Sequence, residues 1–155
     1  MTVTETTGTR TDTCAGPPER GSRRPDGADK YTISEVAALT GLSAHTLRWY
    51  ERIGLMPHID RSHTGQRRYT NRDLDWLALV GKLRLTGMPV ADMVRYAELV
   101  REGDHTYAER CALLKATRED VLARIAELQG TLAVLDHKIS IYADAGQPLA
   151  SERSR

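Results

Sequence analysis

The 155-residue sequence contains no phenylalanine, and its aromatic residues are six tyrosines and two tryptophans. Any hydrophobic core must therefore depend on leucine, valine, isoleucine and alanine. Two cysteines, Cys14 and Cys111, are too few for a disulfide framework. No stretch approaches the roughly 18 consecutive apolar residues of a membrane span, and the N-terminus lacks the apolar run of a secretory signal. We expect a cytoplasmic protein with no membrane partner.

Net charge is also nearly absent, but the charges are unevenly distributed. The chain has 22 Lys and Arg against 21 Asp and Glu, a net charge of +1. Residues 30–89 hold nine basic and five acidic residues, whereas residues 90–146 hold seven basic and ten acidic residues. The near-zero net charge excludes a uniformly basic protein surface. Residues 30–89 nevertheless have the basic excess that contacts with DNA phosphates need.

Both ends of the chain have few apolar residues. The first 29 residues are rich in threonine, glycine, proline and arginine, a composition that cannot offset the entropy of ordering. We predict disordered tails over residues 1–29 and 147–155. A basic arm that touches DNA is the weaker alternative for the first tail, because five acidic residues outnumber its four basic residues.

Two short helices separated by a glycine are predicted from Lys30 onward. Thr32-Ile33-Ser34-Glu35 is a capping box, and Gly41 ends the helix that it opens. Ser43 is the N-cap candidate of a second helix that ends at Gly54. This pair predicts a helix-turn-helix, in which the second helix enters the major groove of DNA.

A short β-hairpin, or wing, is predicted between Leu55 and Tyr69, with residues 62–66 at its tip. Thr70 then caps a third helix that ends at Gly87. A fourth helix begins at Pro89 and ends before residue 103. Together these elements predict a winged helix-turn-helix domain over residues 30–102.

The segment 103–146 is predicted to be a single long helix. Thr106-Tyr107-Ala108-Glu109 has the form of another capping box, and no clear stop follows until Gly146. About 39 residues at ~1.5 Å each give roughly 58 Å, which indicates a coiled coil. Alternating steps of four and three from Tyr107 to Tyr142 give eleven positions, and only Arg118 among them is charged. The seam residues expected in a dimer are Leu114, Val121, Ile125, Leu128, Leu132, Leu135 and Ile139.

Candidate DNA contacts cluster on the second short helix and the wing. Arg48 is expected to read a base edge, with Tyr50 and Arg52 on phosphates. Adjacent Arg67 and Arg68 point to opposite faces of a hairpin, so one reaches phosphate while the other pairs internally. A solvated helix face and an ordinary charged hairpin remain the alternatives. The candidates are Ser43, His45, Thr46, Arg48, Tyr50, Arg52, Arg61, Arg67, Arg68 and Tyr69.

Several motifs occur in a characteristic order. They are Tyr31-Thr32-Ile33-Ser34-Glu35-Val36-Ala37, Thr46-Leu47-Arg48-Trp49-Tyr50-Glu51-Arg52-Ile53-Gly54-Leu55, Gly65-Gln66-Arg67-Arg68-Tyr69 and Leu83-Arg84-Leu85-Thr86-Gly87-Met88. With them the chain resembles the mercury-resistance regulator (MerR) family from about Lys30 to Met88. The long helix extends the resemblance to about Tyr142.

The resemblance implies a mainly α fold, with a winged helix-turn-helix domain followed by a long antiparallel coiled-coil dimerisation helix. It implies a homodimer on double-stranded promoter DNA with a pseudo-palindromic operator. It also implies that Lys82 and Arg84 contact backbone phosphates. Family members bend and untwist an overlong promoter spacer so that RNA polymerase engages, which makes the polymerase an indirect partner.

The resemblance does not extend to the known sensor sites. Metal-sensing relatives carry a cysteine where this chain has Tyr107, so no metal or other cofactor is predicted. A thiol-responsive subgroup carries its cysteine in the third helix, where this chain has Leu83. Cys111 is expected to be a small buried hydrophobe, with a thiol switch as the alternative. We expect a short form without a C-terminal ligand domain, and the sequence does not identify a small-molecule inducer.

We therefore expect a bacterial DNA-binding transcription regulator of the MerR type. The alternative is a coiled-coil architectural or recombination-accessory protein that binds DNA without regulating initiation. An enzyme is not expected, because the sequence has no Ser-His-Asp set, paired carboxylates or phosphate-binding loop.

Overall fold

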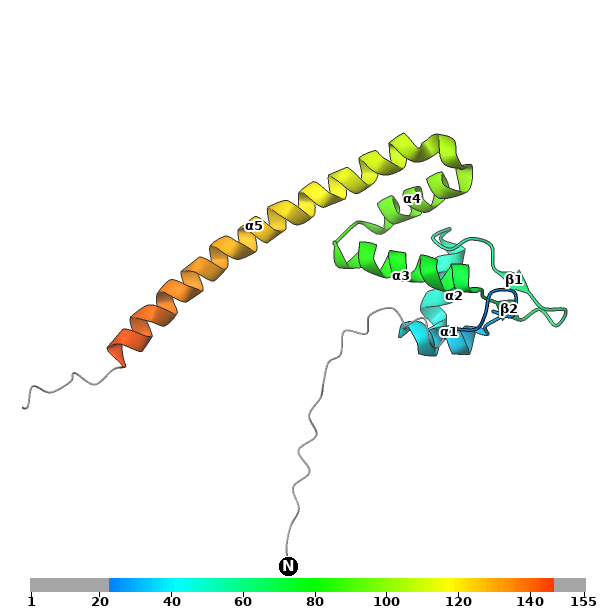
Figure 1. The fold of residues 1–155 in the computed structure, drawn as a ribbon, viewed down its shortest axis with the longest axis horizontal. Coiled ribbons are helices and arrows are strands. Elements are labelled where there is room, and N and C mark those ends of the chain that lie inside the picture. The colour runs from blue at the N-terminus through cyan, green and yellow to red at the C-terminus, as the bar shows by residue number, and fades with distance from the viewer. Residues whose placement is uncertain (1–22, 147–155) are drawn as a thin grey trace, which may run out of the picture.

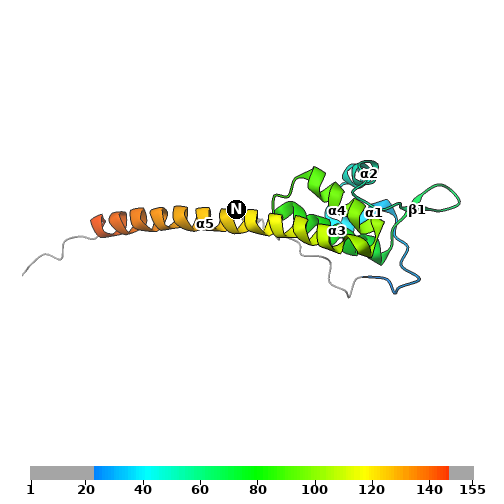
Figure 2. The ribbon, with the colours of Figure 1, turned by 90° about the horizontal axis from the view of Figure 1, so that it is seen from above.

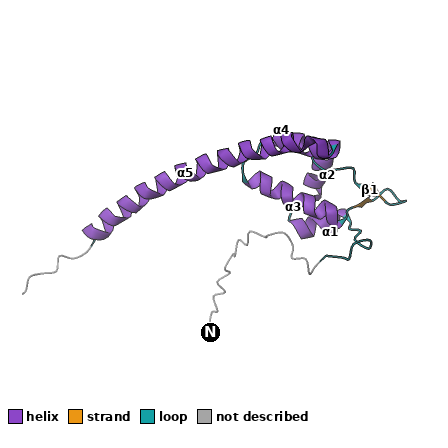
Figure 3. Ribbon diagram, turned by 45° about the horizontal axis from the view of Figure 1, so that its top comes forward, coloured by secondary structure: helices purple, strands orange, loops and turns teal. Residues whose placement is uncertain are grey.

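The computed structural model describes residues 23–146 and is mainly helical (Figures 1 and 3). The elements are α1 (Ile33–Thr40), α2 (Ala44–Arg52), β1 (Asp60–Arg61), β2 (Arg67–Arg68), α3 (Asn71–Leu85), α4 (Val90–Glu102), the 3-10 turn η2 (Asp104–Thr106) and α5 (Tyr107–Ala145). The predicted fold class, a helix-turn-helix region followed by a long helix, is confirmed. The predicted tails over residues 1–22 and 147–155 lie outside the described residues.

The first three helices begin at the caps that the sequence predicts. The Thr32 hydroxyl accepts from the Glu35 N–H, and the Glu35 carboxylate accepts from the Thr32 N–H at 2.8 Å. Ser43 accepts from the N–H of Thr46 at 3.0 Å at the start of α2. A second capping box, formed by Thr70 and Asp73, opens α3. These local bonds satisfy N–H groups that a helix N-terminus leaves free.

The start of α5 differs from the predicted capping box. Thr106 is buried, and its hydroxyl lies 2.6 Å from the Leu99 carbonyl and 2.7 Å from the Gly103 carbonyl instead of accepting from Glu109. The preceding 3-10 turn directs this side chain inward. Arg110 then donates to the Thr106 hydroxyl at 3.0 Å and to the Gly103 carbonyl at 2.8 Å. The α4–α5 elbow is thus held by polar contacts across the turn.

Residues 23–29 are hydrogen-bonded to the head, the domain formed by α1 to α4 and the hairpin, which differs from the disordered tail predicted for this stretch. Asp29 is buried, and its carboxylate accepts from the N–H of Asn71, the first residue of α3, at 2.7 Å. The Asn71 side chain donates to the Arg24 carbonyl at 2.8 Å and accepts from the Tyr31 hydroxyl at 2.9 Å. The bond from the Asn71 N–H lowers the pKa of Asp29 below its ordinary value.

One core joins α1 to α4 and the base of the hairpin. It includes the fully buried Val36, Leu47, Leu55 and Leu74, and Leu113 of α5 packs against its edge. The first part of α5 lies along α4, and the remainder projects beyond the head (Figures 1 and 2). The hairpin and the free end of α5 point in opposite directions (Figure 1). Between residues 23 and 146, no helix is both long and apolar enough to cross a membrane.

Candidate nucleic-acid interface

A notch of about 390 Å³ lies between the start of α1, the middle of α2 and the wing. Three arginines and no acidic residue line this notch, so it suits an anionic backbone. The structure thereby brings together arginines that the sequence placed in two separate motifs. The lining residues are Thr32, Ile33, Ser34, Arg48, Gly65, Gln66, Arg67 and Arg68.

The exposed face of α2 carries the polar residues expected of a recognition helix. His45, Arg48 and Arg52 are exposed and are spaced by three and four residues, so they share one face. Ser43 is exposed at the N-cap, and its hydroxyl lies 2.9 Å from that of Thr46. The opposite face packs into the core, which fixes how the polar face is presented.

Tyr50 lies in the core, which corrects its predicted phosphate contact. The side chain is 2% exposed, and its hydroxyl accepts a hydrogen bond from Nη1 of Arg84 at 2.9 Å. This contact ties α2 to the last turn of α3, because the two residues come from those elements. Tyr50 therefore supports α2 from its buried face.

Tyr69 is likewise buried, and its predicted phosphate contact is also corrected. The residue is 1% exposed, and its hydroxyl has no hydrogen-bond partner among residues 23–146. Burial raises the pKa of this hydroxyl above its ordinary value. The Tyr69 backbone exchanges two hydrogen bonds with Tyr31, at 2.8 and 2.9 Å, and so joins the wing to the segment before α1.

The wing arginines divide between internal and open positions. Arg67 Nε donates to Oε2 of Glu51 at 2.6 Å, which confirms the expectation that one of the adjacent arginines pairs internally. Arg61 Nη2 lies 3.6 Å from Oε1 of the same carboxylate, and Arg61 Nη1 donates to the Gly65 carbonyl at 3.2 Å. Within the described part of the chain, Arg68 makes no ion pair.

Lys82 and Arg84 form a separate basic pair. Both are exposed in the last turn of α3, and neither lines the notch. Their predicted contact with backbone phosphates stays a prediction.

Sequence reasoning missed Glu51, the acidic partner of the wing. Its partners Arg61 and Arg67 lie 10 and 16 positions away along the chain, beyond the reach of helical spacing. A hairpin register that pairs two arginines across the strands was the signal that an acidic partner was required.

Comparison with known proteins identifies the family. The model described as "MerR HTH family regulatory protein" matches residues 31–99. An uncharacterised HTH-type transcriptional regulator of Haemophilus influenzae is 41% identical over 115 residues, covering 74% of this chain and 85% of the relative. The chain belongs to the MerR family.

Solved structures agree with this assignment. One, described as HiNmlR, a MerR-family regulator lacking the sensor domain and bound to promoter DNA, is 40% identical with a TM-score of 0.68. It is matched over 92% of its length and 75% of this chain. A putative MerR-family regulator from Listeria monocytogenes is 39% identical, with a TM-score of 0.70 and coverage of 73% of this chain and 86% of its own. The chain is thus a DNA-binding transcription regulator of the MerR type.

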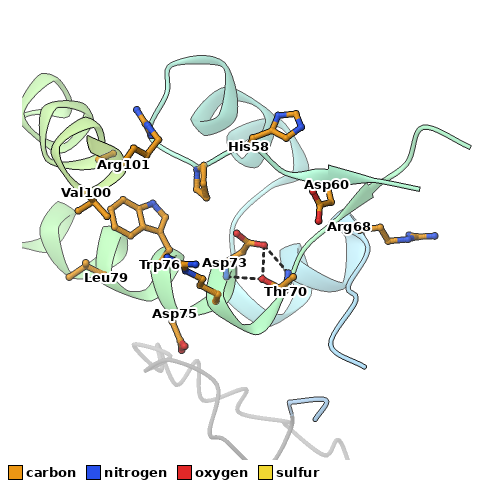
Figure 4. A pocket seen from close by; sticks show the side chains of 13 residues that line it. His58, Asp60, Arg68, Thr70, Asp73, Asp75, Trp76, Leu79, Val100 and Arg101 are labelled. Carbon is orange, nitrogen blue, oxygen red and sulfur yellow. Dashed lines mark hydrogen bonds between the residues drawn. The ribbon is translucent and has the colours of Figure 1, made fainter. Parts of the chain in front are cut away.

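The MerR-family head also has a cavity of about 630 Å³ between the base of the wing, α3 and α4 (Figure 4). Trp76 forms a wall of it, stacks on Tyr96 at 6.1 Å between ring centroids, and donates to the Leu55 carbonyl at 2.8 Å. Thr70 and Asp73, the capping pair of α3, lie at its floor (Figure 4). The contacts of Trp76 thus join α3 to α4 and to the segment that precedes the wing.

Cys111 is exposed on α5 in the single chain, at one of the predicted seam positions. Its expected burial therefore depends on a partner helix, and the thiol switch stays a prediction. From residue 23 to residue 146, no group of three or more His, Cys, Asp and Glu side chains is arranged to hold a metal ion.

Proposed function

We propose that this MerR-family chain binds a pseudo-palindromic promoter operator as a homodimer and controls initiation by bending and untwisting the spacer. The observation that supports this proposal most directly is α5, a 39-residue helix whose predicted seam faces solvent in the single chain. Leu128 is 64% exposed and Ile139 is 63% exposed. An apolar stripe along a helix of roughly 58 Å requires a partner helix for burial.

The charges of α5 favour an antiparallel partner. Residues 107–126 hold four basic and three acidic residues, whereas residues 127–145 hold one basic and three acidic residues. Antiparallel pairing sets the more basic half against the more acidic half. Ile125 is the sixth of the eleven seam positions, so pairing about this residue matches the seam to itself. The resulting two-fold axis relates the two heads and suits an operator with two half-sites.

Each head is proposed to contact DNA in two places. Arg48 reads a base edge in the major groove, while the start of α2 and Arg68 of the wing contact the backbone. Lys82 and Arg84 contact flanking phosphates. The full proposed set is Ser43, His45, Thr46, Arg48, Arg52, Arg68, Lys82 and Arg84. The DNA-bound structure described for HiNmlR supports promoter DNA as the partner.

Transcription from the chain's own target promoter tests the untwisting mechanism. The spacer is shortened in single-base-pair steps, and transcripts are measured with and without the protein. We expect shortened spacers to become active without the protein, because the promoter elements then align without distortion. A parallel series with the same deletions upstream of the operator serves as the control.

Regulation that is unchanged by spacer length would contradict the proposal. RNA polymerase would then not depend on DNA distortion by this protein. DNA binding without any effect on transcription would favour the architectural role instead.

A further inference from the structure

We propose that Glu51 is a positioning residue for DNA recognition, which holds the wing against the recognition helix as the shared counter-ion of Arg61 and Arg67. The inference deepens the proposed DNA interface and rests on it. It concerns how the wing is held, whereas the interface concerns which residues touch DNA.

The wing cannot hold its own position. Strands β1 and β2 have two residues each, and an isolated two-stranded hairpin is marginally stable. Its register sets Arg61 directly opposite Arg67, so both guanidinium groups project from the same face. Like charges placed directly across a ladder destabilise it. The hairpin therefore needs an anion on that face.

Glu51 supplies that anion from α2. One carboxylate oxygen lies 2.6 Å from Arg67 of β2, and the other lies 3.6 Å from Arg61 of β1. The side chains of Glu51 and Arg67 are only 18% and 22% exposed, so water screens this pair less than a surface pair. One carboxylate thus connects both strands of the wing to the recognition helix.

The contact sets the position of the whole wing tip relative to Arg48. The tip is closed by hydrogen bonds of 2.8 Å from the Ser62 N–H to the Gln66 carbonyl and from the Gly65 N–H to the Ser62 carbonyl. Glu51 lies one helical turn after Arg48, so the tip and the base-reading residue are fixed to the same turns of α2. Arg68 follows Arg67 and projects from the opposite face, where it is available for phosphate.

Because Glu51 is negatively charged, a positioning role and simple electrostatics predict opposite changes in DNA affinity when the charge is removed. Replacing Glu51 by Gln removes a negative charge beside DNA, which by long-range electrostatics alone would tighten binding. A positioning role predicts weaker binding, because the wing loses its fixed place. Asp60→Asn is the matched control: this wing residue is 73% exposed, and its ion-pair contact is with Lys30 at 3.9 Å.

The affinity of the full chain is measured by fluorescence anisotropy on two probes. One is a duplex enriched by the wild-type protein from a random library, and the other is a random-sequence duplex. We expect Glu51→Gln to weaken binding to the enriched duplex by about tenfold. We expect Asp60→Asn to leave it unchanged or tighter. Equal or tighter binding by Glu51→Gln would overturn the inference.

Arg67→Gln provides a second route if Glu51→Gln does not fold by circular dichroism. Because Arg67 acts through Glu51, we expect a similar loss of affinity, and the double variant should bind no more weakly than either single variant. The salt dependence of binding should keep its slope in Arg67→Gln but lose about one unit in Arg68→Gln. A reduced slope in Arg67→Gln would show a phosphate contact and overturn the inference.

Arg48→Ala separates failure of this inference from failure of the interface. If Arg48→Ala binds both duplexes with wild-type affinity, the proposed interface is wrong. If Arg48→Ala loses preference for the enriched duplex while Glu51→Gln behaves like wild type, only the positioning role is wrong.

Discussion

The arginines of the proposed DNA interface differ in what their guanidinium groups contact. Arg67 is paired with Glu51, and Arg84 donates to the Tyr50 hydroxyl. Arg48 and Arg68 make no ion pair within residues 23–146. A guanidinium that already has a partner has fewer free N–H groups and less uncompensated charge for a phosphate, so Arg48 and Arg68 are expected to contribute most to DNA affinity.

Tyr69→Phe tests the corrected role of a wing residue. The Tyr69 hydroxyl is buried without a partner in the described structure, and such a group costs about 1–3 kcal/mol. We expect the variant to have an unchanged free energy of unfolding, or one raised by up to about 1 kcal/mol, in urea denaturation. DNA affinity should not change, since the hydroxyl does not reach solvent.

A loss of DNA affinity in this variant, together with a lower salt slope, would restore the phosphate contact expected from the sequence. A marked loss of stability would instead show that the hydroxyl has a partner in the folded protein. Tyr50→Phe is the useful comparison, because its hydroxyl is bonded to Arg84 and its removal should reduce stability.

At the scale of elements, α3 depends on a segment that is distant in sequence. Asp29 accepts from the N–H at the start of this helix, and the same bond lowers its pKa. A carboxylate whose pKa is lowered by folding stabilises the protein above the ordinary carboxyl pKa of about 4. That contribution is lost as the pH falls through the lower folded-state value.

Asp29→Asn is therefore expected to lower the free energy of unfolding at neutral pH, with a difference from wild type that shrinks as the pH falls below about 4. Thermal unfolding measured across this range gives the comparison. Asp120→Asn, on the exposed part of α5, is the control and should follow the wild type. A difference that stays constant with pH would mean that the Asp29 charge is not involved.

The sequence predicted the elements whose contacts are short-range along the chain and missed contacts between distant residues. The Thr32 and Thr70 caps join residues three positions apart, so the sequence was sufficient to place α1 and α3. Asp29 and Asn71 are 42 positions apart, and the composition of the first tail gave no indication of their contact. Thr106 is a residue type that commonly caps helices. Its hydroxyl instead lies within hydrogen-bond distance of the Leu99 carbonyl of α4 and the Gly103 carbonyl of the preceding turn.

The same distinction between local and distant interactions applies to the proposed DNA interface. Sequence spacing placed His45, Arg48 and Arg52 on one face of α2, because helical periodicity is local. It did not separate tyrosines that contact phosphate from tyrosines that fill the core. In a chain without phenylalanine, Tyr31, Tyr50 and Tyr69 occupy buried positions of the head.

At the scale of the whole molecule, the proposed dimerisation through α5 sets how many copies of the DNA-binding domain meet DNA. Leu128→Glu places a charge in the proposed seam, whereas Ala126→Glu places the same charge on the outer face of the same helix turn. Light scattering should show a dimer for wild type and Ala126→Glu. Leu128→Glu should be monomeric or strongly weakened, and a Leu128→Glu variant that remains dimeric would refute the seam.

The most direct test of paired heads on DNA is a hydroxyl-radical footprint of the full chain on the enriched duplex. We expect two protected half-sites, related by symmetry and facing the same side of the duplex, as two heads joined by antiparallel α5 helices require. Leu128→Glu should lose this joint protection at the same protein concentration. A single protected half-site with wild-type protein at saturation would contradict dimeric binding.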